Sequence, residues 1–141
     1  KRLSQIEAYK KSIQEIALFI KEMNGRGISI IFAGPTPEFE STAVQCVEEW
    51  FRVNRNGCSV SVDSVNKKRK RYLESLSDLG ESFPLVYFWD PLPSICDSGV
   101  CRVVRNNKLM FRDKHHLSIF GSNALADSFV DLTNLIRAKS L

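Results

Sequence analysis

The chain has 141 residues, of which 43% are hydrophobic and 26% charged, and its formal net charge is +4. This length suits one domain that buries roughly 70% of its unfolded surface, and the composition excludes an intrinsically disordered chain. No apolar run approaches the ~20 residues of a membrane span, and the modest positive charge does not by itself indicate nucleic-acid binding.

Residues 1–5 begin without methionine and lack the apolar core of a signal peptide. We therefore expect the chain to be a piece of a longer protein, with a targeting or membrane segment upstream. The sequence contains no internal repeat or low-complexity tract, so residues 1–141 are expected to form one domain.

A helix and a strand are the first elements predicted. Residues 3–24 carry apolar side chains at alternating steps of three and four, which is typical of one buried helical face: Ile6, Tyr9, Ile13, Ile16, Ile20 and Met23. Residues 28–33 are apolar and largely β-branched, as in a buried parallel strand. The sequence Gly34-Pro35-Thr36-Pro37 then ends the strand. This order is typical of α/β proteins, in which ligands gather at the carboxyl ends of the strands.

The middle of the chain is predicted to be helical in two places. Residues 38–58 include a short helix carrying Cys46, with apolar positions Phe39, Val44, Val47, Trp50 and Phe51. Residues 59–65 are a strand fragment or an extended link. Asp63 or Ser64 then caps a helix to about Leu79, with Val65, Tyr72, Leu73, Leu76 and Leu79 facing inward. The basic run at residues 67–71 is predicted to be a solvated helical face, because no RNA-binding motif accompanies it.

Residues 83–89 are predicted to form the second buried strand, which ends at Asp90-Pro91. Residues 92–101 follow as a loop at the same edge of the sheet. Apolar residues then flank a polar turn at residues 105–108, which predicts a small hairpin. This hairpin would lead into the histidine segment that follows it and would position that segment.

The four cysteines are Cys46, Cys58, Cys96 and Cys101, and their spacing does not match the C-x-x-C pair of a zinc site. Pairing in sequence order would close two small loops, although three connectivities are open to four cysteines. Disulfides would imply a periplasmic or extracellular setting. The alternative is a cytosolic protein with four reduced thiols.

Both histidines of the chain lie in residues 111–121, and Asp113 stands three residues before His116. A carboxylate beside an imidazole can fix its tautomer and stabilise the imidazolium, which leaves the second ring nitrogen free to take a proton from a hydroxyl nucleophile. We predict Asp113 and His116 as a catalytic pair; the alternative is a solvated loop. Ser118 is predicted to cap the last helix, whose buried positions are Leu125, Phe129, Leu132 and Ile136.

The segment Asp113-x-x-His116-Leu-Ser followed by Gly121 resembles the last conserved block of SGNH-type hydrolases and esterases. The run from Trp89 to Gly121 is most similar to the SGNH domain fused to the membrane acyltransferases (acyltransferase family three) that O-acetylate surface polysaccharides. The Gly34, Pro37 and Glu38 turn also matches that family.

This resemblance implies a three-layer α/β/α, flavodoxin-like fold with a parallel sheet, present here as a C-terminal portion. It also implies acyl transfer to lipopolysaccharide O-antigen or peptidoglycan in an extracytoplasmic domain of an inner-membrane protein. Asp113 and His116 would be catalytic, and neither a cofactor nor a metal would be required. The implied partners are an acyl donor, a carbohydrate acceptor and an upstream transmembrane acyltransferase domain, with no nucleic acid.

The family's Gly-Asp-Ser nucleophile segment is absent from the 141 residues. We therefore expect the serine, and the glycine and asparagine that hold the oxyanion, to lie before Lys1, and the chain alone to be inactive. Three alternatives remain: a free secreted carbohydrate esterase, a non-catalytic carbohydrate-binding or interaction domain on an SGNH scaffold, and a cytosolic nucleic-acid binder that uses residues 67–71.

Overall fold

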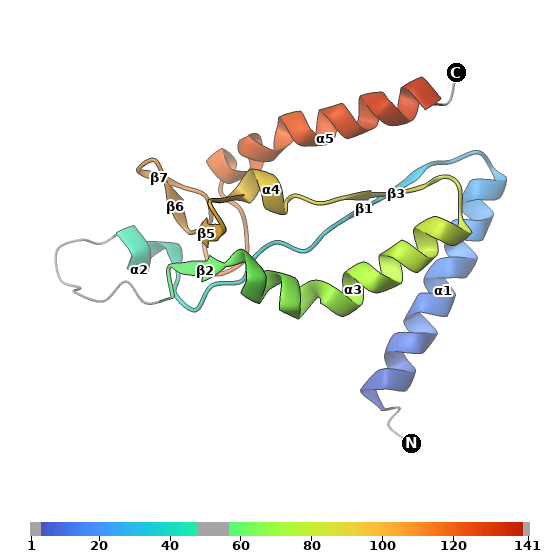
Figure 1. The fold of residues 1–141 in the computed structure, drawn as a ribbon, viewed down its shortest axis with the longest axis horizontal. Coiled ribbons are helices and arrows are strands. Elements are labelled where there is room, and N and C mark those ends of the chain that lie inside the picture. The colour runs from blue at the N-terminus through green and yellow to red at the C-terminus, as the bar shows by residue number, and fades with distance from the viewer. Residues whose placement is uncertain (1–3, 48–56, 140–141) are drawn as a thin grey trace. The chain divides into compact units, whose positions relative to one another are not determined.

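The structure is a computed structural model that describes residues 4–47 and 57–139 (Figure 1). The chain divides into two compact units, each described separately below. The first comprises Lys1–Ala33 and Lys70–Trp89, and the second Gly34–Arg69 and Asp90–Leu141. Within the described residues, no helix has both the length and the apolarity needed to cross a membrane.

The first unit contains a two-stranded parallel sheet and two helical segments. Strands β1 (Ile30–Ala33) and β3 (Val86–Trp89) pair in parallel with Ile30 opposite Val86. Helix α1 (Gln5–Gly25) and the later part of α3 (Val62–Ser82) pack on this sheet. The core comprises Ile20, Leu76 and Leu79, with neighbouring side chains that are partly buried: Ile16, Ala17, Ile30, Phe32, Phe83 and Val86.

Polar contacts fix the ends of these elements. Ser4 and Glu7 form a capping box at the start of α1, with the Ser4 Oγ accepting from the Glu7 amide at 3.2 Å. Tyr9 on α1 makes a 2.6 Å hydroxyl contact with Ser75 on α3. In the last turn of α1, the Asn24 Oδ1 accepts from the amide of Leu85 at 3.2 Å, which ties the end of this helix to the turn before β3.

In its described residues, the second unit holds short antiparallel strands, three helices and the first turns of α3. Strands β2 (Ser59–Ser61), β5 (Val100–Arg102) and β4 (Cys96–Asp97) form one sheet in that order, and β6 (Val104–Arg105) pairs with β7 (Lys108–Leu109). The helices are α2 (Ala43–Val47), α4 (Leu92–Ile95) and α5 (Ile119–Lys139).

The predicted hairpin at residues 103–111 is confirmed. Asn106 and Asn107 have φ of 52° and 59°, the left-handed pair that a two-residue turn between β6 and β7 requires. A second hairpin joins β4 to β5 inside the segment predicted as a loop, with Ser98 and Gly99 at φ of 46° and 78°. Sequence patterning missed this hairpin because its strands are too short to show alternation.

Disulfides join Cys46 to Cys58 and Cys96 to Cys101. The second bridge connects residues that lie directly opposite each other on β4 and β5. The pairing is therefore in sequence order, one of the three connectivities left open above.

Several details of the predicted helices are wrong. Ile6 and Phe129, predicted to be buried, are 56% and 39% exposed. Helix α3 begins at Val62, before Asp63 and Ser64, because the Ser61 Oγ accepts from the Ser64 amide at 3.2 Å and acts as the cap. Tyr72, predicted to face inward, is 37% exposed and donates its hydroxyl to the carbonyl of Ala33. Trp50 and Phe51, assigned to the short helix, lie outside the described residues.

Candidate active site

The segment from Phe111 to Leu117 is a tight loop whose two ends pair with each other. The Arg112 amide donates to the carbonyl of His116 at 2.9 Å, and Phe111 and Leu117 form an isolated antiparallel bridge. Phe111 is fully buried and packs edge-on against Phe39, with ring centroids 4.8 Å apart. The base of the loop is therefore anchored in the core of the second unit.

The turn after β1 also holds this loop. The amide of Phe39 donates to the Lys114 carbonyl at 2.8 Å, and the Thr36 hydroxyl donates to the His115 carbonyl at 3.3 Å. Gly34 and Pro37 are buried, whereas Glu38 is exposed. The Gly-Pro turn singled out in the sequence thus supports the histidine loop through the Thr36 hydroxyl, and Phe39 adds a main-chain hydrogen bond just after the turn.

Asp113 lies at the centre of the loop and uses both carboxylate oxygens. Its Oδ1 accepts from the amides of His115 and His116 at 3.0 and 2.8 Å, and its Oδ2 lies 2.8 Å from the His116 Nδ1. The hydrogen bond from the His115 amide, followed by that from His116, lowers the pKa of Asp113 well below its ordinary value of 3.8. Asp113 is consequently a carboxylate at neutral pH.

This arrangement fixes the chemistry of His116. A carboxylate only accepts hydrogen bonds, so the proton between the two side chains belongs to the His116 Nδ1. In the neutral ring, the Nε2 then carries a free lone pair, and the side chain is 54% exposed. His116 is thus oriented to accept a proton at Nε2, while Asp113 stabilises the imidazolium that results.

His115 is placed differently, although it is adjacent. Its ring centroid is 4.1 Å from that of His116, but its Nδ1 is 4.0 Å from the Asp113 Oδ1, beyond hydrogen-bond distance. Asp113, His115 and His116 could each supply one donor atom to a metal ion, since these atoms lie within 4.8 Å of one another. A metal there would have to displace the 2.8 Å contact between His116 and Asp113.

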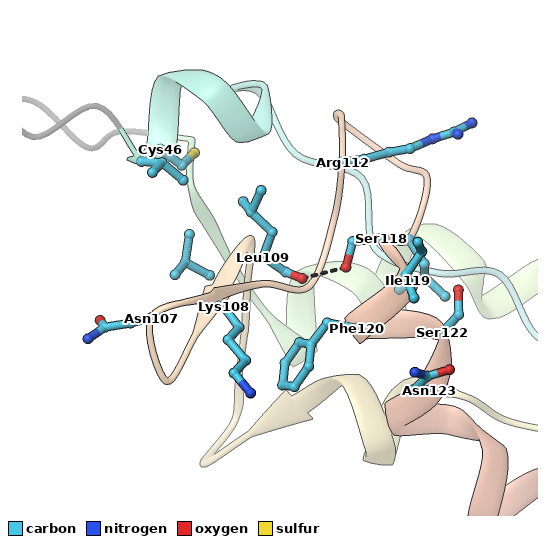
Figure 2. A pocket seen from close by; sticks show the side chains of 13 residues that line it. Cys46, Asn107, Lys108, Leu109, Arg112, Ser118, Ile119, Phe120, Ser122 and Asn123 are labelled. Carbon is cyan, nitrogen blue, oxygen red and sulfur yellow. Dashed lines mark hydrogen bonds between the residues drawn. The ribbon is translucent and has the colours of Figure 1, made fainter.

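Ser118 starts helix α5 immediately after the loop, and its hydroxyl is fully occupied. The Oγ donates to the Leu109 carbonyl (Figure 2). It also accepts from the Gly121 amide at 3.0 Å. The Ser118 amide donates to the Met110 carbonyl at 2.9 Å. These contacts confirm that Ser118 is a capping residue.

Gly121 allows α5 to approach the hairpin this closely. A Cβ at this position would lie 2.0 Å from the Met110 carbonyl oxygen, a distance that no side chain tolerates. The glycine that follows the histidine motif therefore has a packing role here.

A cavity of about 1300 Å³ opens beside the loop (Figure 2). It lies between the β6–β7 hairpin, the first turns of α5, and α2. Arg112 and Leu117, the immediate neighbours of Asp113 and His116, both contribute to its wall. The wall of the cavity thus includes sequence neighbours of the aspartate–histidine pair, whereas Asp113 and His116 themselves do not line it.

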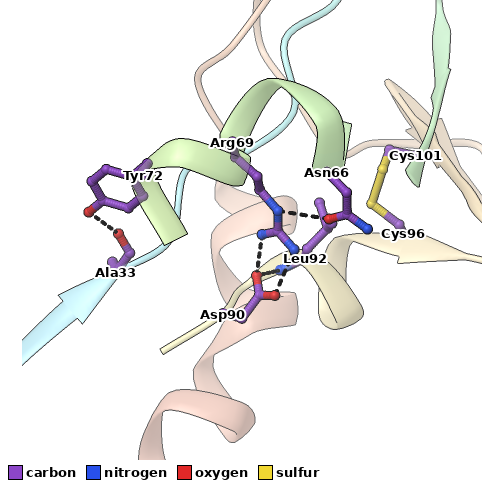
Figure 3. Close-up of polar contacts among 8 residues, drawn as sticks. All are labelled: Ala33, Asn66, Arg69, Tyr72, Asp90, Leu92, Cys96 and Cys101. Carbon is purple, nitrogen blue, oxygen red and sulfur yellow. Dashed lines mark hydrogen bonds and ion pairs between the residues drawn. A yellow bond between two sulfur atoms is a disulfide. The ribbon is translucent and has the colours of Figure 1, made fainter. Parts of the chain in front are cut away.

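Sequence reasoning missed a buried ion pair below the loop that follows β3. Arg69 is only 7% exposed and binds both carboxylate oxygens of Asp90, at 2.6 and 2.8 Å (Figure 3). Asp90 also accepts from the Leu92 amide at 3.0 Å, and Arg69 donates to Asn66. The prediction that residues 67–71 form a solvated face is therefore wrong at Arg69. Asp90-Pro91 at the end of a strand was the only available signal.

The comparisons with known proteins show the family of this chain. A family model described as "SGNH domain (fused to AT3 domains)" matches residues 2–131. The chain belongs to this SGNH family. The assignment agrees with the resemblance drawn from residues 89–121, and it extends over nearly the whole sequence.

One solved structure resembles this SGNH domain: the lipopolysaccharide acetyltransferase periplasmic domain of Salmonella ser. Paratyphi A. The TM-score is 0.64 at 18% identity, with 88% of this chain and 49% of that chain covered. At this identity the match shows the fold alone, and it confirms the predicted α/β class. The SGNH domain spans about half the length of that structure. Among curated proteins, none matches the chain.

Proposed function

We propose that this SGNH domain is the extracytoplasmic part of an O-acyltransferase that moves acetyl or other acyl groups onto cell-surface polysaccharide. Membership of a family described as fused to AT3 domains supports the link to acyl transfer. The observation that carries the mechanism is the 2.8 Å contact between His116 Nδ1 and Asp113, with the other oxygen of Asp113 held by two backbone amides.

The nucleophile would come from outside these 141 residues. The family resemblance implies a serine in a Gly-Asp-Ser segment, and no such segment occurs in this chain. Ser118 is the serine nearest the pair in sequence, and its hydroxyl caps α5. We therefore expect the 141 residues alone to have no esterase turnover.

The reaction would proceed in two steps at His116. The Nε2 takes the proton of the serine hydroxyl as its oxygen attacks the acyl carbonyl, and then returns that proton to the departing donor. A sugar hydroxyl next loses its proton to Nε2, attacks the acyl-serine, and the serine oxygen leaves with that proton. Asp113 stabilises the imidazolium in both steps. Water in place of the sugar would give hydrolysis, which is the free-esterase alternative.

The neighbouring histidines provide a matched test in cells that make the complete protein. His116→Ala should lower the O-acetyl content of surface polysaccharide by about 100-fold or more, because general acid–base catalysis contributes about 10²–10⁴ in rate. His115→Ala should retain most acetylation, since its ring nitrogen lies 4.0 Å from Asp113. Acetyl content can be quantified by NMR of the purified polysaccharide. Full acetylation in the His116 variant would favour the non-catalytic alternative.

A further inference from the structure

The cavity beside the aspartate–histidine loop has a lining that selects for charge. We propose that it holds an acidic segment of the acceptor glycan, one whose sugars carry carboxylate or phosphate groups. The proposal rests on the function proposed above and names the substrate class that this site would take. Because Arg112 and Leu117 flank the catalytic candidates and also line the cavity, a glycan bound there would lie next to His116.

The size of the cavity suits a saccharide segment. Its volume of about 1300 Å³ exceeds the ~300–1,000 Å³ of typical small-molecule sites. It is open to solvent, as a site for part of a long polymer must be. A single small acyl donor would leave most of this space unfilled.

Two cations line the cavity, and among the described residues that line it none is acidic. In the described part of the chain no ion pair involves Lys108; its Nζ instead lies 5.1 Å from the centroid of the Phe120 ring. Arg112 is 69% exposed, and within the described residues its ion pair is with the Asp113 Oδ2, which lies 3.8 Å from its Nε and is already bonded to His116. Both side chains therefore keep hydrogen-bond donors for an anionic ligand.

Figure 2 shows Lys108 and Arg112 on either side of Leu109, so the two charges do not converge on one point. A single anion could not satisfy both. A chain of sugars with an acidic group on more than one unit could do so. The guanidinium of Arg112 matches the geometry of both carboxylate and phosphate.

The remaining lining favours sugar rings over a lipid surface. Asn107, Ser122 and Asn123 provide amide and hydroxyl groups for sugar hydroxyls. Ile119, which is 84% exposed at the first position of α5, offers an apolar face for ring C–H groups. Polar groups recessed in a concave wall would be left unpaired against a flat bilayer, and this would cost binding energy.

Measuring the binding of saccharides to the 141-residue chain tests the proposal, because binding does not require catalytic turnover. Three probes are used: trigalacturonate, its methyl ester as a neutral analogue, and a sugar phosphate. Each is titrated into the protein, and its binding is followed by two-dimensional NMR of the backbone amides. Trigalacturonate or the sugar phosphate should shift the amides of Lys108, Arg112 and Asn123, and the difference between the two probes identifies the anion. The ester should bind about tenfold more weakly than trigalacturonate, and added salt should weaken only the charged ligands.

Two double variants provide the control. Lys108→Gln with Arg112→Gln should weaken acidic-saccharide binding about tenfold. Lys67→Gln with Lys68→Gln makes the same change in net charge at exposed positions of α3 outside the cavity, and should leave binding unchanged.

Equal losses in both double variants, equal binding of the ester, or no binding of either acidic probe would overturn the proposal. Binding only to anionic phospholipid vesicles would identify a membrane surface instead. None of these results would alter the dependence of acetylation on His116, so the failure of this proposal is distinguishable from failure of the proposed function.

Discussion

Asp113 has two separable tasks at the level of single residues. Its Oδ1 binds the two backbone amides that shape the loop, and its Oδ2 orients His116. Asparagine could keep the first task through its carbonyl oxygen. It could not keep the second, because an amide nitrogen facing His116 would require the unprotonated form of Nδ1. Asp113→Asn should therefore preserve the loop while disabling the pair.

The lowered pKa of Asp113 predicts how stability depends on pH. Because the folded-state pKa lies below the ordinary value of 3.8, the charged carboxylate stabilises the fold above that pH, and this contribution is lost as the pH falls through the acid range. The advantage of wild type over Asp113→Asn in the free energy of unfolding should thus shrink between pH 6 and pH 3. Urea denaturation of wild type and Asp113→Asn at several pH values measures this difference in the free energy of unfolding. A difference that stayed constant with pH would contradict the assigned hydrogen bonds.

The pairing of Asp113 with His116 could be predicted from the sequence alone. Asp113 and His116 are three positions apart, so one tight loop suffices to bring them together and no long-range packing has to be foreseen. Arg69 illustrates the opposite case. Its partner, Asp90, lies 21 positions away, and nothing in the basic run distinguishes it from the exposed lysines beside it.

At the level of elements, the close approach of α5 to the hairpin predicts opposite effects for two helical glycines. Gly121→Ala would place a methyl group 2.0 Å from the Met110 carbonyl oxygen and should destabilise the fold by about 1–3 kcal/mol. Gly80→Ala, in α3, meets nothing within 4 Å and should stabilise it by about 0.5–1 kcal/mol, because alanine favours helix. Thermal unfolding of both variants provides the comparison. Equal shifts in Tm would argue against the contact between α5 and Met110.

The Arg69–Asp90 pair connects the first turns of α3 to the segment that begins α4. Arg69→Ala would leave Asp90 without its bidentate partner, and should cost about 2–3 kcal/mol in the free energy of unfolding. That figure is below the cost for a fully buried pair because Asp90 is 30% exposed. Lys70→Ala, which removes only a 3.8 Å contact with Glu74 at the surface, should cost under about 0.5 kcal/mol. Similar costs for the two variants, measured by urea denaturation, would refute a structural role for the pair.

The elements that sequence reasoning found share a strong local signal. Helix α1 has a long run of three- and four-residue spacings, and the β6–β7 hairpin has a polar turn between apolar flanks. The β4–β5 hairpin and helix α4 lacked such a signal, because elements of two to four residues show no period. Their positions depend on contacts such as the Cys96–Cys101 bridge, which spacing alone could not assign.

At the level of the whole molecule, the proposed catalytic pair lies on a small α/β scaffold. Its two parallel strands leave Phe88 38% exposed, although parallel sheets are normally covered on both faces. Two disulfides are consistent with folding outside the cytosol. Under the proposed function, other parts of the protein would supply the nucleophile and would also cover the sheet.

Labelling of the complete protein with a fluorophosphonate, which reacts covalently with activated serines, tests this central claim most directly. Peptide mass spectrometry should find the adduct on a serine outside these 141 residues, with labelling lost in His116→Ala and kept in His115→Ala. An adduct on Ser118 or another serine of this chain, or undiminished labelling of His116→Ala, would contradict the assignment of Asp113 and His116 as the catalytic pair.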